Sequence, residues 1–332
     1  MKKFLKIIVL IKLISLFLIL ITIACYSIAA SLRETKLADS IAPVSGRYIK
    51  AGDLQIFVQE MGDPKNPAVL MIHGMGSWSE LWRDTMLALS QNGYYAVAVD
   101  LPPFGFSQRP DPNQLMTINQ ANRLIDLLQN LGIKKVHLLG HSFGGGATLH
   151  TALLIPDRVL SLNLVDVAIS IEQALETEQS ESTLLNSFFE AKWFRNRILE
   201  ATITNPHLTK KLFSLFVYDS NCITQDKVDI IQSPMRIEGT TYYLGDWLGI
   251  FISKSDDQLS KDFVSNKNKL LMPVHFIWGE EDTVTPLSRA EFLQKQFQGS
   301  SLDIMNSVGH IPQLEAPDAF HQILISLLKE SQ

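Results

Sequence analysis

The sequence contains very little cysteine. Its 332 residues include only Cys25 and Cys222, and Cys25 lies inside a long apolar run, so a disulfide between the two is not expected. A chain of this length buries most of the surface that its unfolded form exposes, and it therefore does not need disulfides for stability. The sequence also has no cluster of metal-ligating residues and no nucleotide-binding glycine loop. We therefore expect no metal and no cofactor.

Positive charge is scarce as well. The chain has 29 basic and 34 acidic residues, which gives a formal net charge of −5. Four of the lysines fall within residues 1–30, which contain no acid, so the rest of the chain has 25 basic against 34 acidic residues. An acidic body argues against nucleic acid as the main partner. No feature of the sequence predicts the oligomeric state.

Residues 1–30 form a separate N-terminal segment. Four lysines (Lys2, Lys3, Lys6 and Lys12) precede an uncharged apolar stretch over residues 13–30, whose length is close to the ~20 residues that a membrane-spanning helix needs. Because the basic residues lie mainly before this stretch, we expect a membrane anchor with a cytoplasmic N-terminus and an exported body. The alternative is a signal peptide whose removal would give a secreted protein, since small residues at Ser27, Ala29 and Ala30 would permit cleavage.

After a predicted polar linker at 31–45, apolar runs alternate with amphipathic stretches. Short apolar or β-branched runs predict strands, and apolar residues at helical spacing predict helices. The predicted strands are 54–58, 68–73, 94–100, 135–140, 159–167, 270–278 and 301–305, and the predicted helices are 117–131, 143–154, 286–297 and 316–328. Strands and helices in this order predict an α/β fold with a mainly parallel central sheet flanked by helices.

Between about residues 170 and 262 the strand pattern stops. This segment is helical in composition, rich in aromatic residues, and too long for a structureless loop. We therefore predict an inserted helical cap over 170–262, which divides the core into 46–169 and 263–332. Most of its aromatic side chains are expected to pack within the cap, because large apolar side chains are usually core residues.

The motif Gly140-His141-Ser142-Phe143-Gly144 lies directly between a predicted strand and a predicted helix. In this context a serine occupies a sharp, strained turn, and the flanking glycines let neighbouring segments approach it. Its side chain then points out from the carboxyl edge of the sheet, next to a helix N-terminus that favours developing negative charge. The alternative is a glycine-rich turn with an incidental serine. The strand before it and the helix after it favour Ser142 as a nucleophile.

A serine hydroxyl needs a base, and the base needs an orienting acid. Of the eight histidines, His310 lies between the last predicted strand and the last predicted helix, in the chain order serine, acid, histidine. The acid is predicted to be Asp282, in the turn that precedes a helix. Glu280 and Glu281 beside it are expected to be solvated, and Asp166, at the end of an earlier strand, is a more distant rival.

Taken together, these motifs resemble the α/β-hydrolase superfamily, in its serine hydrolase subgroup with a helical cap. The resemblance is carried by HGMG at 73–76, DLPPFGFS at 100–107, GHSFGG at 140–145, WGEEDTVTP at 278–286 and VGHIPQLEAP at 308–317. It implies that Ser142 attacks an ester-like carbonyl, that His310 acts as base and then acid, and that Asp282 holds the imidazole tautomer. It also implies an oxyanion hole formed by the backbone N–H groups of Met75 and Phe143.

The resemblance covers several reactions. Dehalogenases and epoxide hydrolases of this architecture use an aspartate where this chain has Ser142, so we discount their chemistry. The serine triad also serves C–C hydrolases, lactonases, amidases and perhydrolases, and specificity lies in the cap. The anchor and the aromatic cap favour a small-molecule carboxylic ester with an apolar or lipid-like acyl group, as for an esterase or lipase. The alternatives are the same triad acting on another bond, or a non-catalytic binding member of the fold.

Overall fold

The computed structural model describes residues 2–169, 171, 191–253 and 257–331. An eight-stranded sheet with the order β1-β2-β4-β3-β5-β6-β7-β8 lies at its centre. β2 pairs antiparallel with β1 and β4, and the other neighbours are parallel, so the predicted mainly parallel sheet is confirmed. The strands are β1 (Gly46–Ala51), β2 (Leu54–Met61), β3 (Ala68–Ile72), β4 (Tyr95–Val99), β5 (Val136–His141), β6 (Val159–Val165), β7 (Val274–Gly279) and β8 (Ser301–Met305).

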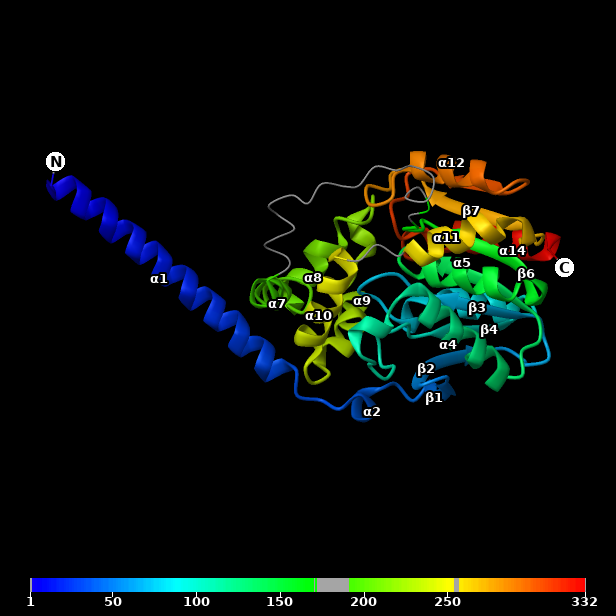
Figure 1. The fold of residues 1–332 in the computed structure, drawn as a ribbon, viewed down its shortest axis with the longest axis horizontal. Coiled ribbons are helices and arrows are strands. Elements are labelled where there is room, and N and C mark those ends of the chain that lie inside the picture. Colours follow the sequence, from blue (N-terminus) through cyan, green and yellow to red (C-terminus); the bar gives the residue numbers. More distant parts are fainter. Residues whose placement is uncertain (1, 170, 172–190, 254–256, 332) are drawn as a thin grey trace.

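Helices cover both faces of the sheet (Figure 1). Alternate residues of β3 show how one strand serves two hydrophobic layers: Leu70 and Ile72 pack on one side, Val69 and Met71 on the other. The first layer includes α4 (Thr117–Asn130), α5 (Gly144–Leu154), α11 (Asp257–Asn266) and α12 (Leu287–Gln296), and the second includes α3 (Arg83–Gln91) and α14 (Pro317–Glu330).

A helical layer, inserted between β6 and β7, lies over the carboxyl ends of the strands (Figure 1). It contains α7 (Lys192–Ala201), α8 (Pro206–Phe213), α9 (Gln225–Gln232) and α10 (Thr240–Ser253). Residues 170, 172–190 and 254–256 of the predicted cap lie outside the described residues. α11 crosses the predicted boundary at residue 263, and its Leu259 and Phe263 side chains belong to the core. The division into cap and core at 170 and 263 stays a prediction.

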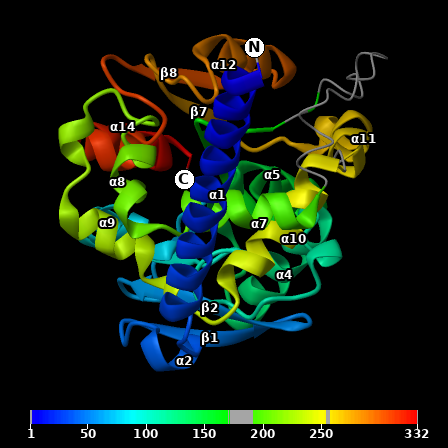
Figure 2. The same ribbon diagram turned by 90° about the vertical axis from the view of Figure 1, so that its left-hand side faces the viewer.

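The long N-terminal helix α1 (Lys2–Arg33) projects from the body (Figures 1 and 2). Its segment Leu10–Arg33 has a mean hydropathy of 2.5 and is long and apolar enough to cross a membrane. By length and composition alone it fits either an anchor or a signal sequence. The helix continues past the predicted boundary at residue 30. The predicted linker 31–45 includes a short helix, α2 (Ala38–Ile41), and Lys36 forms a parallel β-bridge with Ile237.

Candidate active site

Ser142 lies in the turn that joins β5 to α5. Its φ of 50° is in the left-handed region, which is uncommon for a residue other than glycine. The Ser142 N–H donates to the carbonyl of Val165 at 3.0 Å, and the Ser142 carbonyl accepts from the N–H groups of Gly145 and Ala168 at 2.9 and 3.1 Å. These bonds hold the strained backbone in place, so the hydroxyl has a fixed position.

The flanking glycines have the role that the motif predicts. A Cβ atom on Gly140 would overlap the side chain of Thr148 in α5, and a Cβ atom on Gly144 would overlap the carbonyl of His73. The missing side chains therefore let α5 and the loop after β3 lie directly against the turn that carries Ser142.

The structure brings the three predicted triad residues together in series. His310 Nε2 lies 2.8 Å from Ser142 Oγ, and His310 Nδ1 lies 2.7 Å from Asp282 Oδ2. All three residues are buried. When the Nδ1–H donates to the carboxylate, Nε2 is left unprotonated and can accept the proton of the serine hydroxyl.

Asp282 is held as a carboxylate by its own turn. Its Oδ1 atom accepts from the N–H groups of Val284 and Thr285 at 2.7 and 2.9 Å, and its Oδ2 atom accepts from the Thr285 hydroxyl at 2.5 Å. Burial alone would raise the pKa of Asp282, but the hydrogen bonds from His310 and Thr285 outweigh burial and lower it. Glu280 and Glu281 are exposed, as a solvated acidic turn would be.

Asp166, the rival acid at the end of β6, lies next to this pair. Its Oδ1 atom accepts from the Gly279 N–H at 2.9 Å, and its backbone φ is 43°. Burial raises the pKa of Asp166 well above its ordinary value, and the charge of Asp282 raises it further. Asp166, Asp282 and His310 each place a potential ligand atom within 4.8 Å of the others. Because a cation there would compete with the bonds of His310, we assign no metal to this group.

The loop that carries His310 is held from three sides. The His310 carbonyl accepts from His141 Nε2–H at 2.8 Å, and its N–H donates to the carbonyl of Phe216 in the inserted helical layer at 2.7 Å. The Gly309 N–H donates to Glu315 at 2.5 Å. Burial lowers the pKa of His141 to about 3, so its ring is neutral. The sequence did not predict these supporting contacts, although His141 and Glu315 lie inside the GHSFGG and VGHIPQLEAP motifs.

The two predicted oxyanion-hole residues come from different segments of the chain. Phe143 begins the helical turn of α5, with φ −50° and ψ −39°. Met75 lies in the loop after β3, where a Cβ atom on Gly74 would come 3.0 Å from the Cβ atom of Ser142. His73 fixes this loop: its Nδ1–H donates to the Gly74 carbonyl at 2.8 Å, and its Nε2 accepts from the Leu101 N–H at 2.9 Å. The donor role of the two backbone amides stays a prediction.

Four aromatic rings pack against one another, one of them that of Phe143 directly after Ser142, and we refer to them as the aromatic cluster. Phe104 and Phe143 come from the core, and Trp247 and Phe251 come from α10. The Phe143 ring lies 5.6 Å from Trp247 and 5.8 Å from Phe251 (centroid to centroid), while Trp247 and Phe251 stack at 5.1 Å. Phe104 contacts Trp247 edge-on at 5.1 Å. Through Phe143, this cluster links α10 to the residue next to Ser142.

Comparisons with known proteins identify the family to which the chain belongs. A family model described as "alpha/beta hydrolase fold" matches residues 67–317. The chain is 28% identical over 283 residues to 2-hydroxy-6-oxononadienedioate/2-hydroxy-6-oxononatrienedioate hydrolase of Klebsiella pneumoniae, covering 83% of this chain and 91% of the relative. It is 25% identical over 295 residues to monoacylglycerol lipase ABHD6 of Rattus norvegicus, covering 85% and 81%. The fold is also similar to the crystal structure of a membrane phospholipase A, which is described as a novel bacterial virulence factor. The TM-score is 0.62 and the sequence identity 25%, and the match covers 100% of this chain and 99% of the phospholipase chain.

Proposed function

The chain belongs to the α/β-hydrolase fold family and is a hydrolase, and on this premise we propose that it is a serine esterase that cleaves an apolar or lipid-like carboxylic ester. The hydrogen-bonded series Ser142–His310–Asp282 carries the proposal. A hydroxyl, an imidazole and a carboxylate in this order form the arrangement that activates serine for acyl transfer.

The proposed reaction proceeds through an acyl-enzyme. His310 Nε2 takes the proton of Ser142 as Oγ attacks the carbonyl carbon, and the N–H groups of Met75 and Phe143 stabilise the developing oxyanion. His310 then gives the proton to the leaving alkoxide. Water, deprotonated by the same imidazole, releases the carboxylic acid and restores Ser142. Asp282 keeps the Nδ1 proton in place throughout.

Two features support an apolar acyl group. The aromatic cluster includes Phe143, the residue directly after Ser142, and an apolar acyl chain would pack against such rings more favourably than a charged group would. The monoacylglycerol lipase and the membrane phospholipase A are named for lipid substrates.

The match to the phospholipase also includes the N-terminal helix. We therefore propose that α1 is an uncleaved, single-pass anchor and that the catalytic body lies outside the cytoplasm. A secreted form, released by cleavage, is the alternative.

One relative favours a second candidate reaction. The Klebsiella pneumoniae relative is by name a hydrolase of 2-hydroxy-6-oxo dienedioates, substrates cleaved at a carbon–carbon bond, and it is 28% identical to this chain. The same serine, histidine and aspartate would serve that reaction. The aromatic cluster and the anchor make the lipid-like ester the preferred substrate.

The test uses the full-length protein in detergent. A fluorophosphonate probe should label the parent protein, and Ser142→Ala should abolish labelling and lower ester hydrolysis at least ~10³-fold. A series of p-nitrophenyl esters from acetyl to dodecanoyl, run beside a 2-hydroxy-6-oxo dienoate, distinguishes the two reactions. Turnover of the dienoate with none of the esters would establish the second candidate. Equal labelling of the parent and Ser142→Ala would refute a serine nucleophile.

A further inference from the structure

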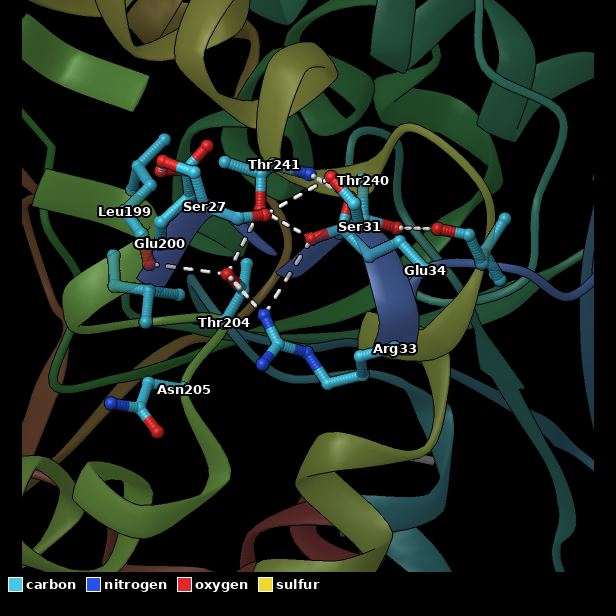
Figure 3. A network of polar contacts seen from close by, with 12 residues as sticks. Ser27, Ser31, Arg33, Glu34, Leu199, Glu200, Thr204, Asn205, Thr240 and Thr241 are labelled. Carbon is cyan, nitrogen blue, oxygen red and sulfur yellow. Dashed lines mark hydrogen bonds and ion pairs between the residues drawn. The ribbon is translucent and has the colours of Figure 1, made fainter. Parts of the chain in front are cut away.

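The last turns of the anchor helix α1 make polar contacts with the inserted helical layer (Figure 3). Ser27 Oγ donates to Glu200 in α7 at 2.8 Å and also accepts from Arg197, which pairs with Glu200 at 2.7 Å. Arg33 Nη2 donates to the Thr204 hydroxyl at 3.0 Å. Polar groups on the last turns of α1 therefore meet complementary groups on the body. A signal peptide that is removed from the folded body would not be expected to make such contacts with it.

Glu34, the first residue after α1, makes the most deeply buried of these contacts. It is 9% exposed, although it lies in the predicted polar linker. Its Oε2 atom accepts from the Thr241 N–H at 2.9 Å, and its Oε1 atom accepts from the Thr241 hydroxyl. That hydroxyl lies 2.9 Å from the hydroxyl of Thr204, which also bonds Arg33. Removing one partner from such a buried network leaves the others unsatisfied.

The position of Thr241 explains what the carboxylate does. Thr241 is the second residue of α10, a 14-residue helix. The N–H groups of a first helical turn have no partner within the helix, and the positive end of the helix dipole favours an anion there. Glu34 therefore caps α10 from outside the helix. The capping group comes from the segment that follows the anchor, 207 residues earlier in the chain.

α10 connects the capping contact of Glu34 to the residue next to the nucleophile. Its next turns carry Trp247 and Phe251, which contact Phe143 directly after Ser142. α10 is also locked to α7: Arg195 donates to the Gly245 carbonyl at 2.8 Å, and a Cβ atom on Gly249 would lie 2.5 Å from the Arg195 guanidinium carbon. α7 contacts the last turns of α1, and α10 contacts Glu34 directly after it, so the anchor is joined to both helices.

We propose that Glu34 is a positioning residue that couples the membrane anchor to the acyl-binding surface. Its carboxylate fixes the first turn of α10, and α10 places Trp247 and Phe251 against Phe143, where the acyl chain of the substrate packs. The inference rests on the proposed esterase function. Losing the Glu34 contact changes how a long acyl chain is held, while the bonds of Ser142, His310 and Asp282 to one another, made by core loops, persist.

The experiment compares a short and a medium acyl ester in the full-length protein. Glu34→Ala should lower kcat/KM for p-nitrophenyl decanoate about tenfold, mainly through KM, because misplacing a contact surface by about 1 Å is costly. Hydrolysis of p-nitrophenyl butyrate and probe labelling of Ser142 should stay within about twofold of the parent. Thr241→Val should act in the same direction and Thr241→Ser should match the parent. The matched control is Glu238→Gln, whose carboxylate is exposed in the neighbouring segment.

Each outcome has a distinct meaning. A parent-like ratio of decanoate to butyrate hydrolysis in both Glu34→Ala and Thr241→Val would overturn the coupling and leave the esterase intact. If Glu34→Ala does not fold, the test depends on Thr241→Val, which keeps the backbone N–H bond to Glu34 and should therefore still fold. In that case, equal ratios of decanoate to butyrate hydrolysis in Thr241→Val and Thr241→Ser would overturn the coupling. A parent protein that neither hydrolyses esters nor reacts with the probe would contradict the proposed function instead.

Discussion

Two buried aspartates lie side by side at the carboxyl ends of β6 and β7, in opposite electrostatic settings. Asp282 receives hydrogen bonds from two backbone amides, a threonine hydroxyl and an imidazole, so its pKa is lowered despite burial. Burial and the neighbouring charge of Asp282 raise the pKa of Asp166. These surroundings shift the pKa values of the two carboxyl groups in opposite directions, and so favour the ionised form of Asp282 and the neutral form of Asp166.

Replacement of each aspartate by asparagine should therefore have unequal effects. Asp282→Asn presents an amide N–H to His310 in place of an acceptor and favours the wrong tautomer, so kcat should fall ~10³–10⁴-fold. Asp166→Asn replaces a carboxyl group whose neutral form is favoured by an amide of the same shape, and kcat should stay within about fivefold of the parent. Both are measured as kcat on p-nitrophenyl butyrate, with Tm as a check on folding. A loss in Asp166→Asn as large as in Asp282→Asn would make Asp166 the orienting acid.

The convergence of Ser142, Asp282 and His310 could be predicted because each follows a strand of a parallel sheet, and the carboxyl ends of such strands share one edge. The state of Asp166 could not be predicted in this way. It depends on complete burial and on a carboxylate from another strand, and neither is visible in the residues around position 166.

At the scale of elements, the buried strands were the easiest to predict. β3, β4 and β8 agree with the predicted ranges to within one residue at each end, and β3 and β4 are apolar runs buried on both faces. β1 was not predicted, because it is an antiparallel edge strand in which polar residues such as Arg47 and Lys50 alternate with Ile49 and Ala51. α3 was missed as well. Thr117 begins α4 rather than preceding it, and its hydroxyl contacts His150.

The loop before α13 (Pro312–Glu315) and the segment 216–218 meet at a glycine. A Cβ atom on Gly309 would lie 2.7 Å from the N atom of Tyr218, 2.8 Å from the Cα atom of Val217 and 2.9 Å from the carbonyl oxygen of Phe216. All three are backbone atoms and cannot rotate away. Gly309→Ala should therefore push the two segments apart and disturb the bond from the His310 N–H to the Phe216 carbonyl.

We expect kcat of Gly309→Ala on p-nitrophenyl butyrate to fall ~10–10²-fold, because the imidazole moves relative to Ser142. Gly299→Ala is the control for stability: Gly299 has a φ of 78° and open space around it, so alanine there costs roughly 1–2 kcal/mol of strain without touching the site. Unchanged kcat in Gly309→Ala, at a Tm similar to that of the control, would show that this close approach does not position His310.

At the scale of the whole molecule, the N-terminal segment differs most from its prediction. The sequence predicted an anchor or signal segment that ends at residue 30, followed by a polar linker over 31–45. The structure continues the helix to Arg33 and buries Glu34 against the body. A polar stretch is usually exposed, and the partner of Glu34 lies 207 residues away. No local pattern could have predicted this contact.

The stability of the body against acid is determined in part by buried histidines. Burial lowers the pKa of His73 and His137 to about 4 and that of His141 to about 3, from an ordinary value of 6.5. Between these values the unfolded chain binds protons that the folded chain does not, so these histidines lower the free energy of unfolding as the pH falls from about 6.5. Asp100, whose pKa burial raises to about 6, acts in the opposite direction together with Asp166.

The effect of a single histidine on acid stability can be measured at His137, because it lies in β5 away from the triad. Its Nδ1 atom is 2.8 Å from the Ser161 hydroxyl, and its Nε2 atom is buried with no hydrogen-bond partner among the described residues. Protonation would bury an unpaired N–H. The lowered pKa implies a loss of about 2 kcal/mol between pH 7 and pH 5. Removing the titration in His137→Gln should therefore reduce the fall in Tm over this range by about 4 °C, measured by thermal melting at both pH values. An equal fall in Tm for the parent and the variant would mean that His137 does not titrate on unfolding, and the acid sensitivity would then have to come from other groups.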